Sequence, residues 1–198
     1  MKTTNIAFSV LRLPMAVLLI AAAMVGCKKD DPAKPEEKAI PTPPSAASTQ
    51  TWTFGTSTLT WSDAIHIPDC NRESFENSYD EPQCRSYAYE GKTYYYYNWP
   101  YVDANKATLC PEPWRVPALD DFKDLVRHTA PPTLQNEWGY GGYASSSASS
   151  CSAAAANYWS CTPYDNYNAY CLWYHTNGAV DPRNATGTDL GFQIRCVK

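Results

Sequence analysis

Cysteine and histidine are the residues of this 198-residue chain best suited to metal or redox chemistry. Between residues 51 and 198 the cysteines are Cys70, Cys84, Cys110, Cys151, Cys161, Cys171 and Cys196. No two of them form a CxxC pair, and His66, His128 and His175 are not at metal-ligand spacing. The pattern predicts disulfides rather than zinc. The segment 71–90, which follows Cys70 and contains Cys84, is polar and turn-rich, and we expect it to be a loop pinned by Cys70 with Cys84.

Catalytic signatures are missing from the sequence. A hydrolase would require a nucleophile elbow, a histidine-based metal motif or paired carboxylates, whereas Glu112, Glu137 and Asp165 are isolated from one another. We therefore expect no enzyme activity, no cofactor and no metal. Turns at 164–166 and 181–184 could supply oxygen ligands to calcium, although such Asp/Asn turns more often satisfy their own backbone, so calcium dependence stays open.

Recognition chemistry gathers toward the C-terminus. An exposed Trp173 beside His175, with polar residues after the next turn, would form a flat apolar surface bordered by hydrogen-bonding groups, as sugar or protein recognition requires. The candidate ligand-binding residues are Tyr164, Asp165, Tyr167, Trp173, His175, Asp181, Arg183 and Asn184. The alternative is that Trp173 packs on the preceding loop and His175 is simply solvated.

Strand alternation must position these side chains. A strand over 169–175 would place Tyr170, Leu172 and Tyr174 on a core-facing side. The same alternation places Cys171, Trp173 and His175 on the surface side. The Asn177–Gly178 dipeptide predicts a hairpin turn after this strand.

Other elements are expected to frame this strand. Residues 51–61 predict a hairpin, 94–97 a strand, and 158–161 and 191–197 two further strands. From Ala118 the apolar residues recur at helical spacing, with acidic residues in the first turn, which predicts a helix. The Ser/Ala-rich stretch 144–156 is expected to be a loop.

The N-terminus predicts export. A basic start precedes an apolar run, 15–25, that is too short to span a membrane, and we assign residues 1–26 as a signal peptide. The ending Met24-Val25-Gly26-Cys27 resembles a bacterial lipobox, which implies lipidation of Cys27. The charges of 28–31 are similar to the signal that sends Bacteroidota lipoproteins to the cell surface.

Composition divides the remainder in two. Residues 27–50 begin with the lipidated cysteine and are rich in Lys, Glu, Pro, Ala, Ser and Thr, which predicts a disordered stalk. Residues 51–198 have the length of one ordinary domain. Removal of Lys2 and Arg12 with the signal lowers the net charge from -4 to -6, so we expect no nucleic-acid partner.

The domain resembles a known family in ordered motifs. Tyr97-Asn98-Trp99, Leu109-Cys110-Pro111, Trp114-Arg115-Val116-Pro117, Tyr158-Trp159-Ser160 and the ending 191–198 are similar to the Fibrobacter succinogenes major paralogous domain. The resemblance covers most of 51–198 and implies an α+β fold of C-type lectin-like type. In that fold a helix flanks a twisted antiparallel sheet, and the two ends of the domain meet.

The resemblance also implies how cysteines pair. Because the two ends of the domain would meet, a disulfide between Cys110 and Cys196 would join them. Cys161 and Cys171 stand where the family pattern has Ser and Asn, a paired departure that predicts a disulfide private to this chain. Cys151 is then the candidate free thiol.

We expect a surface-exposed, lipid-anchored outer-membrane protein that binds a glycan or a protein through its C-terminal strands and loops. Between residues 144 and 190 there is no Glu, Lys, Gln or Met, which is either composition bias or the mark of a variable surface similar to those that diversity-generating retroelements mutate. The alternative function is an accessory subunit of an outer-membrane import or adhesion assembly. A third reading is an enzyme related to the formylglycine-generating group.

Overall fold

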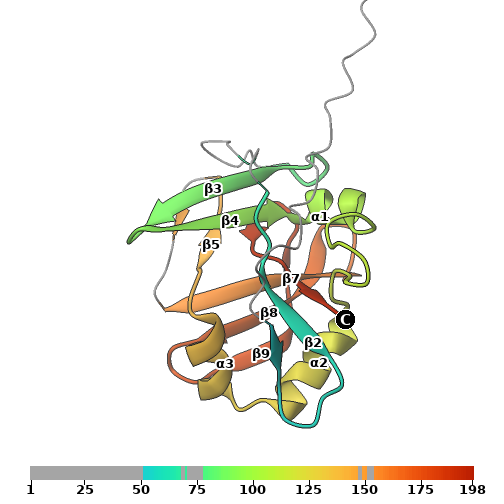
Figure 1. Ribbon diagram of the computed structural model, residues 1–198. Helices are drawn as coiled ribbons and strands as arrows, with labels where there is room; N and C mark the ends of the chain where they lie inside the picture. The colour runs from blue at the N-terminus through green and yellow to red at the C-terminus, as the bar shows by residue number, and fades with distance from the viewer. Residues whose placement is uncertain (1–50, 68–69, 71–77, 147–148, 151–153) are drawn as a thin grey trace, which may run out of the picture. The chain divides into compact units, whose positions relative to one another are not determined.

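The computed structural model describes residues 51–67, 70, 78–146, 149–150 and 154–198. The predicted signal peptide, the predicted lipidation site Cys27, the predicted stalk and Cys151 therefore lie outside the described residues. The described part is of mixed α+β class, with mostly antiparallel strands and a few helices (Figure 1). No helix in these ranges is long and apolar enough to cross a membrane.

The elements are short and strands predominate. The helices are α1 (Trp99–Asn105), α2 (Leu119–His128) and α3 (Pro131–Trp138). The strands before α1 are β1 (Trp52–Thr53), β2 (Thr60–Ala64), β3 (Cys84–Tyr89) and β4 (Lys92–Asn98). The strands after α3 are β5 (Tyr143–Ala144), β6 (Ser149–Ser150), β7 (Ala155–Pro163), β8 (Asn168–His175), β9 (Val180–Gly187), β10 (Gly191–Phe192) and β11 (Arg195–Val197).

One sheet joins the two ends of the described chain. Its order is β1-β2-β11, so the predicted first hairpin is confirmed and the last strand pairs with it. The backbone N–H of Thr60 donates to the carbonyl oxygen of Lys198 at 2.9 Å. The disulfide between Cys110 and Cys196, implied by the family resemblance, is present and ties β11 to the segment after α1.

A second sheet has the order β3-β4-β10-β5-β6. The loop predicted for 71–90 is wrong where β3 forms, because this segment pairs along its whole length with the tyrosine-rich β4, from Cys84 opposite Tyr97 to Tyr89 opposite Lys92. The predicted disulfide between Cys70 and Cys84 is confirmed at the start of β3.

The third sheet, β7-β8-β9, carries most of the predicted site. The turn at Asn177–Gly178 joins β8 to β9 as expected. The loop predicted for 144–156 is wrong in part, because β6 lies within it and β7 begins at Ala155, where neighbouring strands satisfy its backbone. In Figure 1, the β3–β4 hairpin lies at the opposite end of the described fold from α2 and α3.

Buried side chains cover both faces of the third sheet. One core cluster packs α2, α3 and the first hairpin against the face that carries Tyr158, Leu172 and Tyr174. The other packs α1, β4 and both disulfides against the face that carries Trp159 and Cys171. The sheet therefore separates two apolar cores, and only part of its second face stays open.

Local chemistry determines where the helices begin. The side chain of Asn98 accepts a hydrogen bond from the backbone N–H of Tyr101 at 3.1 Å and caps α1. In α2, the carboxylate of Asp121 accepts from the backbone N–H of Ala118 at 2.7 Å and binds the guanidinium of Arg115 with both oxygens. The predicted helix after Ala118 is confirmed.

Arg195 of β11 is a buried cation in the core beside α3. Its side chain is 3% exposed, and the guanidinium carbon lies 4.4 Å from the ring centroid of Trp138, 4.8 Å from Trp52 and 5.3 Å from Tyr158. Nη1 donates to the carbonyl oxygen of Ser62 at 2.8 Å. Three aromatic faces and a carbonyl thus replace much of the hydration that the guanidinium loses.

Candidate ligand-binding site

An open pocket of about 210 Å³ lies on the second face of the β7-β8-β9 sheet. Its lining residues are Tyr143, Ala155, Asn157, Trp173, Asn184, Thr186, Leu190 and Phe192. Strand β7 contributes small and amide side chains, β8 contributes an indole, and β9 contributes an amide and a hydroxyl. Apolar side chains from outside the sheet close the other wall.

Strand pairing brings these residues onto one face. Asn157 of β7 is opposite Trp173 of β8, and Asn184 of β9 is opposite Cys171. Directly opposite residues of antiparallel strands share a face, so the amides and the indole point to the same side. An irregularity in the β8–β9 register between Cys171 and Trp173 sets Asp181 opposite Trp173 and inserts an extra residue into β9.

Hydrogen bonds to other parts of the protein orient the two amides. The Nδ2 group of Asn157 donates to the carbonyl oxygen of Gly142 at 3.4 Å, and that of Asn184 donates to the sulfur of Cys171 at 3.3 Å. Both protein partners thus take an N–H from the amide. A fixed amide on a strand is a more precise recognition group than one on a loop.

Cys171 supports the pocket from beneath. The prediction that this residue faces the surface is wrong, because α1, β4 and β10 cover that half of the face and bury the thiol completely. Burial raises the pKa of the Cys171 thiol to about 12, although the hydrogen bond from Asn184 opposes the rise. Cys171 is therefore a neutral thiol that accepts a hydrogen bond rather than a nucleophile.

The predicted disulfide between Cys161 and Cys171 is wrong, since both cysteines are free thiols. Cys171 is opposite Trp159, two residues from Cys161, and the β7–β8 register shifts between Trp159 and Pro163. A diagonal pair on neighbouring strands has Cβ atoms about 7–8 Å apart or somewhat less, whereas a disulfide requires about 3.5–4.5 Å.

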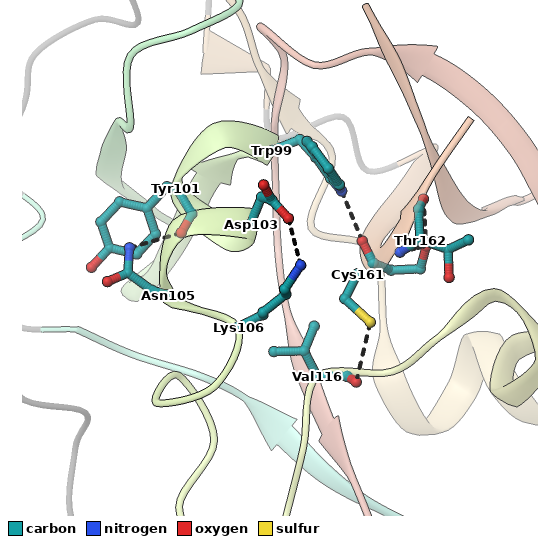
Figure 2. Close-up of polar contacts among 9 residues, drawn as sticks. Trp99, Tyr101, Asp103, Asn105, Lys106, Val116, Cys161 and Thr162 are labelled. Atoms are coloured by element: carbon teal, nitrogen blue, oxygen red, sulfur yellow. Dashed lines mark hydrogen bonds and ion pairs between the residues drawn. The ribbon is translucent and has the colours of Figure 1, made fainter. Parts of the chain in front are cut away.

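Cys161 instead faces the segment before α2. Figure 2 shows its sulfur directed to the carbonyl oxygen of Val116, at 3.9 Å, close to the pair formed by Lys106 and Asp103. Burial raises the pKa of the Cys161 thiol, against the lowering effect of the Lys106 and Arg115 charges. Neither thiol has the lowered pKa that marks a reactive cysteine.

Some of the predicted binding residues, among them Trp173 and Asn184, lie in or beside the pocket. Trp173 and Asn184 line the pocket, and the ring of His175 lies 6.0 Å from that of Trp173 at an interplanar angle of 35°. The carboxylate of Asp181 accepts from the backbone N–H of Arg183 at 2.8 Å. Arg183 is exposed, lies in the irregular stretch of β9 and does not line the pocket.

The remaining candidates form a separate surface at the β7–β8 turn. Tyr164 and Tyr167 are 58% and 63% exposed, and the ring of Tyr167 packs edge-on against Tyr79 at 5.6 Å. Asp165 accepts hydrogen bonds from the backbone N–H groups of Tyr167 and Asn168, both at 2.8 Å, which lower the pKa of its carboxyl. Tyr164, Asp165 and Tyr167 do not line the pocket.

No protein-family model matches this sequence, and no curated protein or solved structure is measurably similar to it. Within the described ranges, no group of three or more His, Cys, Asp or Glu side chains is placed to hold a metal ion. The contacts of the pocket are those of a surface built from aromatic and amide side chains.

Several pocket residues were missed at the level of sequence. Asn157 had a usable signal, because Ala155, Asn157 and Trp159 alternate along β7 and an amide within such an apolar strand is unusual. Tyr143 and Phe192 had none, since they come from two-residue strands in another sheet. Tyr170, expected in the core, is only half-buried and packs against Tyr164 at 5.3 Å.

Proposed function

We propose that this protein is a surface-exposed outer-membrane lipoprotein whose C-terminal sheet binds a glycan or protein ligand. The export signal and Cys27 support the location, and the ordered motifs shared with the Fibrobacter succinogenes major paralogous domain support a C-type lectin-like module. In this proposal the lipid holds the protein on the membrane and the stalk holds the binding domain away from it.

One observation carries the binding role. Trp173 presents an indole in an open pocket whose other strands supply the amides of Asn157 and Asn184 and the hydroxyl of Thr186. An apolar surface with a few fixed polar groups is the usual composition of a small-molecule site. Aromatic side chains also dominate the binding energy of interfaces, because they bury a large area at a low cost in conformational entropy.

The test compares the full chain with its Trp173→Ala variant on an array of glycans, alongside immobilised host and bacterial surface proteins. We expect the substitution to weaken binding at least about tenfold, as for a central aromatic anchor. Tyr89→Ala is the matched control, because Tyr89 is a partly exposed aromatic residue at the end of β3, away from the pocket lining.

Both variants should retain the native melting temperature. Binding that is unchanged in Trp173→Ala would refute the role of this pocket. Binding lost equally in Tyr89→Ala would show that the loss is not specific to the pocket.

A second candidate function is an accessory subunit of an outer-membrane assembly. It is favoured by the exposed tyrosines of the β7–β8 turn and its neighbour Tyr79, since tyrosine is enriched at protein interfaces. In that case the protein would be recovered in a constitutive complex after detergent extraction, and Tyr167→Ser would release it. Recovery as a single chain would argue against this candidate.

A further inference from the structure

We propose that the pocket takes one uncharged sugar ring, held by hydrogen bonds between the sugar hydroxyl groups and the amide and hydroxyl side chains of the pocket. This inference rests on the proposed ligand-binding role and specifies its ligand. Three properties of the pocket carry it, namely its size, the direction of its hydrogen-bonding groups and its charge.

The size of the pocket limits the ligand. Its volume of about 210 Å³ is below the range of about 300–1,000 Å³ for sites that enclose drug-sized ligands. Because the pocket is open to solvent, the rest of a longer ligand would remain outside it. The indole of Trp173 and the apolar side chains of Leu190 and Phe192 provide surfaces on which the C–H face of a ring can pack. One ring of monosaccharide size fits these limits.

Each of the two amides leaves its carbonyl oxygen and one N–H for the ligand. A side-chain amide offers donors at nitrogen and acceptors at oxygen. Because Asn157 donates to Gly142 and Asn184 donates to Cys171, their protein bonds are made through nitrogen. Within the described ranges, neither Oδ1 accepts a hydrogen bond from the protein. The pocket thus presents two carbonyl acceptors, the second N–H of each amide and the hydroxyl of Thr186. Sugar hydroxyl groups can pair with all of them, because a hydroxyl both donates and accepts.

The charge of the pocket disfavours an anion. None of its lining residues is Asp, Glu, Lys or Arg. The charged residue opposite Trp173 is Asp181, and Arg183 is exposed and does not line the pocket. A carboxylate, sulfate or phosphate would find no cation among the lining residues to compensate its lost hydration. The favoured ligands are therefore neutral hexoses and N-acetylhexosamines, and not uronic, sialic or sulfated sugars.

The test titrates the full chain with neutral hexose glycosides, each paired with the uronic acid that differs from it only by a carboxylate at C6. We expect the neutral member of at least one pair to bind and its uronic acid to bind at least about tenfold more weakly. A uronic acid that binds equally or more tightly would overturn the proposal.

Two near-isosteric variants test the acceptors. Thr186→Val removes a hydroxyl and Asn184→Leu removes an amide, and each should weaken neutral-sugar binding by roughly three- to tenfold. Tyr89→Ala should leave the affinity unchanged. Unchanged affinity in both pocket variants, with native melting temperatures, would overturn the proposed contacts.

The outcomes separate this inference from the broader function. If no neutral sugar binds, but an immobilised protein binds and Trp173→Ala abolishes that binding, the sugar proposal is wrong and the binding role of the pocket stands. If Trp173→Ala retains all binding, the pocket is not the ligand site, and both proposals fail.

Discussion

Asn184 of β9 donates its side-chain amide to the sulfur of Cys171 of β8, with 3.3 Å between Nδ2 and Sγ. The thiol is buried and Asn184 lines the pocket, so this bond connects the core of the sheet to its binding face. If the pocket binds the proposed ligand, Cys171 would act as a positioning residue for Asn184 without reacting itself.

Substitution of Cys171 should alter binding more than its small volume suggests. Cys171→Ala removes the acceptor that holds Asn184, and we expect sugar or protein affinity to fall by roughly three- to tenfold. Cys171→Ser restores an acceptor and should recover most of the affinity. Calorimetric titration of the three proteins checks this. Equal affinity in the alanine and serine variants would contradict a positioning role.

Reactivity should distinguish the two free thiols. In the native protein we expect iodoacetamide to modify half-buried Cys161 slowly and Cys171 only after unfolding, because Cys171 is buried with a pKa raised to about 12. The pKa of Cys161 is also raised by burial, so its alkylation rate should still increase at a pH where an ordinary thiol has levelled off. Peptide mapping by mass spectrometry checks this, and a linked Cys161–Cys171 peptide would contradict it.

The two disulfides should contribute unequally to stability. Cys110 and Cys196 are 86 residues apart and Cys70 and Cys84 are 14 apart. Loop-closure entropy predicts that removal costs about 4–5 kcal/mol for the long loop and about 3 kcal/mol for the short one. Urea unfolding of the two double-serine variants measures the difference. A larger loss for the Cys70–Cys84 pair would show that native contacts, rather than loop length, decide the ranking.

Arg195 should not be replaceable by lysine. Arg195→Lys keeps the charge but loses the planar contacts with Trp52, Trp138 and Tyr158, and we expect the free energy of unfolding to fall by about 2 kcal/mol. Exposed Arg183→Lys is the control and should change it by less than about 0.5 kcal/mol. A loss in Arg195→Lys no greater than in the control would mean that the aromatic contacts add nothing to the buried charge.

The β7–β8 turn should loosen in acid. The folded-state pKa of Asp165 is lowered by hydrogen bonds from Tyr167 and Asn168, so its contribution is present above the ordinary value of 3.8 and is lost as pH falls below that value. NMR titration should place the carboxyl midpoint below 3.8, and the amide proton of Tyr167 should exchange more readily as the carboxylate protonates. Asp165→Asn should abolish this pH dependence. A midpoint at or above 3.8 would contradict the role of the turn.

Local patterns predicted much of the frame. The hairpin near Trp52, the helix after Ala118 and the Asn177–Gly178 turn depend on neighbours in the chain, and these elements are present. Alternation along β8 correctly placed Leu172 and Tyr174 in the core. These features follow from periodicity and turn chemistry, which act over a few residues.

Tertiary packing decided the binding face. Alternation put Cys171, Trp173 and His175 on one side, but could not show that α1, β4 and β10 cover the end of that side at Cys171 and leave the end at Trp173 open. The register shift between Trp159 and Pro163 likewise separates Cys161 from Cys171. A cysteine count cannot reveal such a shift.

The sequence by itself determined which residue types were available and that a strand would carry Trp173, whereas it predicted a turn where β9 carries Asn184. The tertiary structure alone decided that Asn157 and Phe192 would join them. These residues are 35 positions apart and meet through pairing between strands and sheets, where hydrogen bonds and burial are satisfied only once the whole chain has folded.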